Sequence, residues 1–391
     1  MKNKLIIILI LILICSGCYN YNELNTLAII SGMSIDYKDD KYVVNVLIAN
    51  SKQAQVSSKE GESQSIVYEG KGKTLSEALK EIEIISPKSL YIGHLSFIVV
   101  SEDLAKKGLK DTMDFLIREP GSTKRFYLIL AKEEDAKSVL QIVSPLESFP
   151  SQSISIAISF SKESQAVTSD IPYSSFVEKL LETGSEPILP SIEIKGNTKK
   201  GKSEESLKET TPKAYLKLST LALFKGDKFV HFTNEEESDG INIINDDSEE
   251  MLIECNCSGG KASIELRNID TNYKIKFENN EPVLTIKVEA AGAIQESTCI
   301  LDLDNEKIIL DIEQKANEEI KRLMQKALEV SQKFETDIFG FGNLLYKYHP
   351  TYFKNIKKSW NEDGFKNLKI KKDVSVRLET KGSIESRIKE K

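Results

Sequence analysis

The sequence of 391 residues has few cysteines, histidines and catalytic motifs, and these scarcities exclude several classes of protein. Five cysteines do not make the disulfide framework of a small secreted scaffold. The three histidines, His94, His231 and His349, show no ligand spacing relative to one another or to the cysteines, so we expect no metal site. A Gly-rich phosphate loop, a Gly-x-Ser-x-Gly elbow and a His-Glu-x-x-His helix are also missing. We therefore expect no catalytic residues and no cofactor.

An excess of positive charge is missing as well. Asp and Glu number 60 and Lys and Arg number 53, which gives a net charge of -7 at pH 7. An acidic chain is repelled by phosphates, so nucleic acid is not an expected partner. The same charge repels anionic lipid headgroups. The charge balance therefore predicts that any membrane attachment depends on a lipid anchor and not on a basic surface.

The only long apolar run stands at the start of the chain. Two lysines precede the run from Leu5 to Ile14, which has about half of the roughly 20 residues that a membrane-spanning helix needs. This length is typical of a signal peptide, here residues 1–17, that is removed after export. Gly17 and Cys18 have the residue types of a lipoprotein cleavage site, and diacylglyceryl lipidation of Cys18 would anchor the mature chain stably. An ordinary cleaved signal peptide is the alternative.

Three cysteines lie beyond this cleavage site, and their pairing stays open. Cys255 and Cys257 are one residue apart, and Cys299 would leave one of the three without a partner. In a strand, residues 255 and 257 point to the same face of the sheet. Buried free thiols are therefore the interpretation that we favour.

The length predicts two or three domains. Residues 18–194 alternate between strand and helix patterns and are expected to form an N-terminal α+β region with up to two subdomains. Residues 195–213 contain almost nothing apolar, so we expect a polar linker or loop there. Residues 214–391 form the predicted C-terminal domain.

Local patterns in the N-terminal region predict several elements. Two β-rich runs, 27–35 and 42–49, flank a polar turn and indicate a hairpin. Thr74 with Glu77 three residues later indicates the start of a helix. Further patterns predict strands at 96–100 and 125–130, a helix over 103–117, and mostly helical structure over 133–181.

The C-terminal region has the clearest periodic patterns. Strict alternation over 283–290 predicts a strand, with further strands at 251–257, 262–266, 273–277 and 368–378. An apolar stripe at helical spacing over 306–334 predicts one long helix that lies on the sheet. We expect an antiparallel sheet with this helix packed on it. The fold class is thus α+β, with mixed sheets and packed helices in several domains.

Short motifs are spaced along the whole chain. Cys18 is followed by Glu-Leu at position 23, and later motifs carry Gly32 and Asp36, Gly93 and His94, Arg118, and the run Asp337-Ile-Phe339-Gly340-Phe341-Gly342. In type and order these motifs resemble those of the Ger(x)C family of spore germination lipoproteins. Glu23 belongs to the motif that follows the acylated cysteine in that family.

The resemblance implies a role and partners. Members of the family are C subunits of GerA-type nutrient germinant receptors, with a mixed α and β fold. The implied partners are two integral membrane subunits, one of them permease-like, and the implied location is the outer face of the spore inner membrane. The chain would be a non-catalytic subunit needed for receptor assembly and for the response to germinant. The alternative is a free-standing extracytoplasmic lipoprotein that binds a solute for uptake.

The motif residues have a structural interpretation. Gly340 and Gly342 permit a positive φ or a close approach of two backbones. Phe339 and Phe341 are expected to pack under the long helix. We expect His94, at the entrance of a strand, to have a structural role as well.

Overall fold

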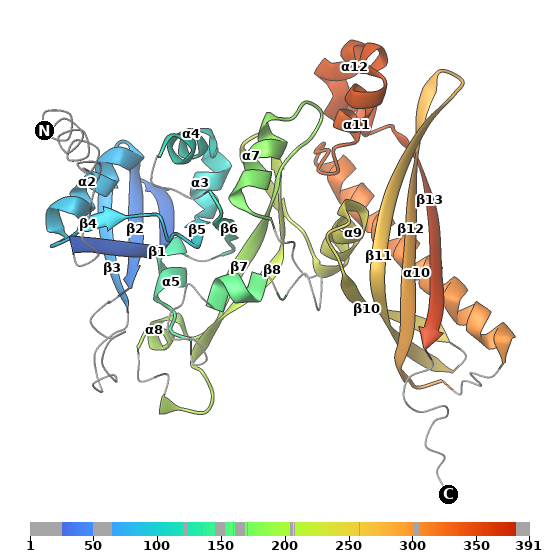
Figure 1. The fold of residues 1–391 in the computed structure, drawn as a ribbon, viewed down its shortest axis with the longest axis horizontal. Helices are drawn as coiled ribbons and strands as arrows, with labels where there is room; N and C mark the ends of the chain where they lie inside the picture. The colour runs from blue at the N-terminus through green and yellow to red at the C-terminus, as the bar shows by residue number, and fades with distance from the viewer. Residues whose placement is uncertain are drawn as a thin grey trace, which may run out of the picture.

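The structure is a computed structural model that describes residues 26–49, 65–119, 124–133, 135–144, 153–158, 160, 169, 171–203, 206, 208–257, 259–299 and 305–380. Two β-sheets, each covered by helices, confirm the expected α+β class. Figure 1 shows the two sheets next to each other along the longest axis of the molecule. The predicted signal peptide, Gly17, Cys18 and Glu23 lie outside the described residues. Among the described helices, none combines the length and apolar character that crossing a bilayer requires.

The first sheet has nine strands. The strand order is β3-β2-β1-β5-β6-β7-β8-β9, and β4 pairs with β1 outside this path. The inner strands β1, β5, β6 and β7 are parallel, and the flanking pairs are antiparallel. The strands are β1 (Leu27–Lys38), β2 (Lys41–Ala49), β3 (Ser65–Gly72), β4 (Ser89–Tyr91), β5 (Phe97–Val100), β6 (Tyr127–Ala131), β7 (Ile188–Gly196), β8 (Ala214–Lys225) and β9 (Lys228–Phe232).

The predicted elements of this region are largely present. The hairpin of β1 and β2 turns at Asp39 and Asp40, both with positive φ. Thr74 caps its helix by accepting a hydrogen bond from the amide of Glu77. The helix predicted over 103–117 is divided at Gly108, whose φ of 129° no α-helix permits. The helices are α2 (Leu75–Ile85), α3 (Glu102–Lys107), α4 (Lys110–Arg118), α5 (Ala136–Gln141), α7 (Tyr173–Leu181) and α8 (Thr198–Gly201).

The second sheet has the order β10-β11-β12-β13, with the long helix α10 (Glu306–Lys333) packed on it. Its strands are β10 (Glu250–Cys257), β11 (Gly260–Glu278), β12 (Glu281–Ser297) and β13 (Lys369–Thr380). The strands predicted at 262–266 and 273–277 are one strand, β11, which is irregular between Arg267 and Asp270. The first three strands are antiparallel as expected, but β13 runs parallel to β12, so the expectation is wrong for this strand. The helices between β12 and β13 form a crossover that returns the chain to the same end of the sheet.

Residues 195–213 do not separate the two sheets. This segment joins β7 to β8, which are antiparallel neighbours in the first sheet, and β9 continues the same sheet. The chain passes to the second sheet after β9, through helix α9 (Glu235–Asn245), which no sequence pattern had indicated. A segment with few apolar residues can be an exposed connection between neighbouring strands or a linker between domains. Composition alone does not distinguish the two.

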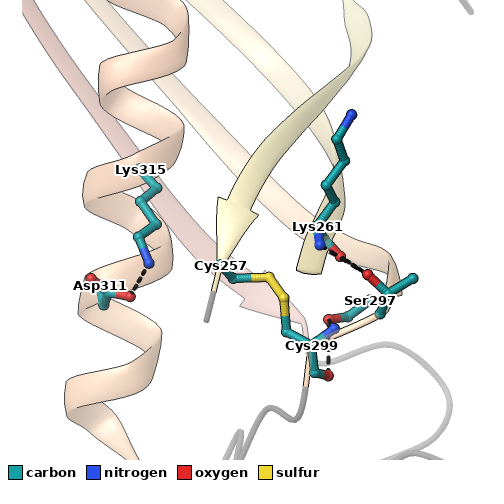
Figure 2. Close-up of a disulfide and its surroundings, with 7 residues drawn as sticks. Cys257, Lys261, Ser297, Cys299, Asp311 and Lys315 are labelled. Atoms are coloured by element: carbon teal, nitrogen blue, oxygen red, sulfur yellow. Dashed lines mark hydrogen bonds and ion pairs between the residues drawn. A yellow bond between two sulfur atoms is a disulfide. The ribbon is translucent and has the colours of Figure 1, made fainter. Parts of the chain in front are cut away.

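A disulfide joins Cys257 to Cys299, with 6.2 Å between their Cα atoms (Figure 2). Cys299 follows β12, and the antiparallel register of β11 with β12 brings it beside the end of β10. Cys255 is a buried free thiol, and burial raises its pKa to about 11. The free-thiol interpretation is therefore right for Cys255 and wrong for Cys257.

We predict that replacing both Cys257 and Cys299 by serine lowers the free energy of unfolding by about 2–4 kcal/mol, because the bond closes a loop of 42 residues in the unfolded chain. Urea unfolding with and without reductant measures this. The wild type should lose stability in reductant and the double variant should not. Cys255→Ala is the control that keeps the sensitivity to reductant, and a reductant-insensitive wild type would contradict the pairing.

A candidate functional site at the junction of the two sheets

Asp337 is the first residue of the motif that ends at Gly342, and the later residues of the motif fold around its carboxylate. The side chain is fully buried between α10 and α11 (Phe341–Tyr348). Its Oδ1 accepts hydrogen bonds from the amides of Gly340 and Phe341, at 3.0 and 3.1 Å. Its Oδ2 accepts from the Gly342 amide at 2.7 Å and from the Trp360 indole Nε1 at 2.8 Å. One carboxylate thus satisfies three backbone N–H groups and one side-chain N–H.

Local geometry explains why this motif needs its aspartate and its glycines. Gly340 has a φ of 76°, and this left-handed turn lets three successive amides converge on the carboxylate. Burial raises the pKa of Asp337 to about 6, whereas the hydrogen bonds from Gly342, Trp360 and Phe341 oppose that rise. At pH 7 the group is therefore mostly ionised, the form that can accept all four hydrogen bonds.

The same carboxylate closes a helical excursion. Between Gly340 and Trp360 the chain forms α11, α12 (Pro350–Ile356) and the 3₁₀ turn η3 (Lys357–Ser359). Trp360 begins the π-helical turn η4 (Trp360–Phe365). Because Asp337 binds the first residues of this excursion and its last residue, Trp360, both ends are held at one point. We call residues 340–360 the excursion below.

Aromatic rings surround the carboxylate. Phe339 and Phe341 are both buried and stack with ring centroids 5.1 Å apart. They belong to the same apolar core as the buried stripe of α10, and Phe365 packs against both rings. The low-polarity surroundings strengthen the hydrogen bonds to Asp337 and make an unpaired N–H there costly.

The first sheet reaches this site through the loop between α7 and β7. Gly184 has a φ of 75°, and its carbonyl accepts a hydrogen bond from the Asn343 amide at 2.9 Å. The amide of Glu186 donates to the Asp337 carbonyl at 2.8 Å. A Cβ atom on Gly184 would lie 2.6 Å from the carbonyl carbon of Gly342. The two backbones can approach this closely only because both positions are glycine.

Charged groups extend the junction. The Glu186 carboxylate accepts hydrogen bonds from the Gly226 amide at 2.5 Å and from the Asn361 side chain at 2.6 Å. Lys225, in the first sheet, pairs with Glu335 at 3.0 Å and with Glu362 at 3.2 Å. These contacts join the β8–β9 turn to the C-terminal helices on either side of Asp337.

Three buried polar atoms at the junction make no hydrogen bond within the described part of the chain. They are Ser185 Oγ, Thr336 Oγ1 and Asn361 Oδ1. A buried polar atom without a partner costs free energy.

The remaining motif residues lie apart from Asp337. Gly32, in β1, faces the ring of Phe97, which a Cβ atom would approach to 2.6 Å. Asp36, near the end of β1, is buried, and burial raises its pKa. Gly93 and His94 form a turn after β4, where His94 is exposed and its ring lies 5.8 Å from that of Tyr91. Arg118, at the end of α4, is exposed and pairs with Asp114 at 2.9 Å.

Three junction residues were missed by the sequence analysis: Gly184, Glu186 and Trp360. Trp360 is the single tryptophan of the chain, and its rarity was a usable signal. Gly184 and Glu186 stand in an ordinary loop sequence, and nothing in their spacing indicates a contact with residues about 150 positions away. Within the described ranges, no cluster of three His, Cys, Asp or Glu side chains could hold a metal ion.

Comparison with known proteins assigns the chain to a class. Residues 20–194 match the spore germination protein N-terminal domain, and residues 219–382 match the spore germination B3/GerAC-like C-terminal domain. These two matches cover most of the chain and have the order that the motifs predicted. The chain belongs to the Ger(x)C family of spore germination proteins.

Individual relatives agree with this assignment. The chain is 26% identical to spore germination protein KC of Bacillus subtilis (strain 168), over 93% of this chain and 92% of that protein. It is 24% identical to spore germination protein GerQC of Bacillus cereus, over 83% and 85% of the two chains. The crystal structure of the GerBC protein has a similar fold, with a TM-score of 0.54, 17% identity, and coverage of 89% of this chain and 96% of that one.

We predict that Asp337→Asn destabilises the protein at pH 7 although the two side chains have the same shape. The amide NH₂ would face two of the four N–H donors and leave them unpaired, at about 1–3 kcal/mol each. Thermal and urea unfolding measure the loss. Asp363→Asn, at an exposed position of the same domain, is the matched control. Equal stabilities of the two variants would show that the carboxylate does not organise the junction.

A pair of glycine variants tests the close approach of the α7–β7 loop to helix α11. Gly184 and Gly226 both have positive φ, but only a Cβ atom on Gly184 would meet other atoms, whereas Gly226 has open space. Gly184→Ala should therefore destabilise the protein by at least about 2 kcal/mol more than Gly226→Ala, which bears only the backbone strain. Urea unfolding of both variants decides this, and equal losses would contradict the contact.

Proposed function

We propose that this protein is a non-catalytic lipoprotein subunit of a spore nutrient germinant receptor, needed for receptor assembly and for the response to germinant. The observation that carries the proposal is that both domain matches to spore germination proteins extend over nearly the whole chain. The junction around Asp337 supports a structural role for the longest family motif, since its carboxylate binds four N–H groups of the protein itself.

The proposed location is the outer face of the spore inner membrane, with Cys18 as the lipid anchor. A signal peptide followed by Gly17 and Cys18 supports export and lipidation. The disulfide between Cys257 and Cys299 also supports export, because such bonds persist mainly outside the reducing cytosol. The proposed partners are two integral membrane subunits, one of them permease-like.

The architecture argues against the solute-uptake alternative. A binding protein for uptake usually has two similar lobes of parallel sheet around a cleft. Here the first sheet is mixed with nine strands, and the second has four strands and one long helix. The two halves are not repeats of each other. Support for assembly is therefore stronger than support for solute capture.

A spore strain that carries Cys18→Ser tests the proposal. Serine cannot form the thioether that holds the diacylglyceryl group, so we expect less of the protein in the inner membrane fraction and a slower nutrient response. Germination by a non-nutrient route should be unchanged. Cys15→Ser, which keeps Cys18, is the control. Normal nutrient germination in a strain that lacks the whole gene would contradict the receptor role, provided that no second copy of the gene is present.

A further inference from the structure

The excursion carries a local positive charge that the acidic net charge conceals. No Asp or Glu occurs between residues 338 and 361, although 60 are present in the chain. The same stretch contains four lysines, all exposed: Lys347, Lys354, Lys357 and Lys358. Lys354 lies in α12, and Lys357 and Lys358 lie in the 3₁₀ turn η3 that directly follows it. Phe353 and Trp360 of the same segment are buried in the core and hold it against the domain.

Exposed aromatic rings lie beside these lysines. Tyr346 and Tyr348 are 43% and 62% exposed. Phe277, at the tip of the β11–β12 hairpin, contacts Tyr352 and His349 with ring centroids 5.1 and 4.7 Å apart. Figure 1 shows α11, α12 and this hairpin tip together at one end of the second sheet. The carboxylates of the hairpin tip, Glu278 and Glu281, are paired with lysines of β13.

We propose that the excursion is a lipid-contact surface that binds anionic phospholipid headgroups through its lysines and places its tyrosines at the membrane interface. Lysine extends a long apolar chain with a charged end, and tyrosine has an apolar ring with a polar tip, the combination found at membrane interfaces. Protein interfaces are instead depleted in lysine. The charge and composition therefore fit an anionic lipid surface better than a protein partner.

This surface would orient the protein on the membrane. In Figure 1 the N-terminal strands and the excursion lie toward opposite ends of the longest axis. A lipid anchor at Cys18 alone leaves the body free to pivot. A second contact through the excursion would hold the long axis along the membrane. The inference uses the proposed function only for this orientation, because the lipid contact itself rests on the charge and exposure of the excursion.

Vesicle binding without the lipid anchor tests the proposal. The chain without residues 1–18, which keeps every described element, is sedimented with vesicles of phosphatidylcholine alone or with added phosphatidylglycerol. We expect binding only to the anionic vesicles, and weaker binding as salt is raised.

Replacing Lys354, Lys357 and Lys358 by glutamine should lower the partition coefficient about 100-fold, or about fivefold per lysine. Tyr346→Ser with Tyr348→Ser should weaken it further at high salt, where the apolar contribution remains.

A matched triple variant shows whether binding depends on the lysines of the excursion or on the total charge of the protein. Lys199, Lys200 and Lys208 are exposed lysines of the segment that joins β7 to β8, and their replacement by glutamine removes the same charge. This variant should bind almost as the wild type does. Absent binding to anionic vesicles, or equal losses in the two triple variants, would overturn the proposal. Unchanged vesicle binding together with lost co-purification of the membrane subunits in detergent would also overturn it and indicate a protein contact instead. None of these results depends on the germination phenotype of Cys18→Ser.

Discussion

The contact between one buried carboxylate and four N–H groups organises the C-terminal half of this protein. Asp337 holds the start of α11 and the indole of Trp360, so the excursion is closed at a single point. The backbone carbonyl of Asp337 also accepts a hydrogen bond from the amide of Glu186, in the loop that leads into β7 of the first sheet. Asp337 therefore links the α7–β7 loop to both ends of the excursion, and its carboxylate is the acceptor for three backbone N–H groups of the family motif.

Periodic patterns predicted the elements whose stability depends on local sequence and one buried face. The alternation over 283–290 predicted β12, and the stripe over 306–334 predicted α10. In both cases the spacing of the apolar residues shows which face of the element is buried. Contacts between distant segments left no such pattern. The pairing of Cys257 with Cys299 and the approach of Gly184 to Gly342 depend on the register of strands and on loop paths. Helix α9 was missed because Gly240 interrupts its pattern, and the structure shows that this glycine lies against the backbone of α10.

Net charge proved a poor guide to the surface. The excess of carboxylates is real, but lysines gather in the excursion, where acidic residues are absent from the sequence. The net charge of the whole chain does not show where charges of one sign gather. Electrostatic attraction to a membrane depends on the charges within about one Debye length of it, roughly 10 Å. The sequence-based expectation that membrane attachment depends on a lipid anchor and not on a basic surface stays a prediction, and the lipid contact proposed for the excursion is its competitor. The excursion is one part of the protein where the local charge and the net charge differ in sign.

The parallel pairing of β13 with β12 has a consequence for how the chain folds. Strand β13 is the last element among the described residues, and it completes the sheet on which α10 packs. Until residues 369–380 emerge, β12 keeps an open edge and the core under α10 has one side exposed to solvent. Contacts this distant in sequence form slowly. The second domain is therefore expected to complete its core only after residues 369–380 have been made, and to fold more slowly than a domain built from local contacts.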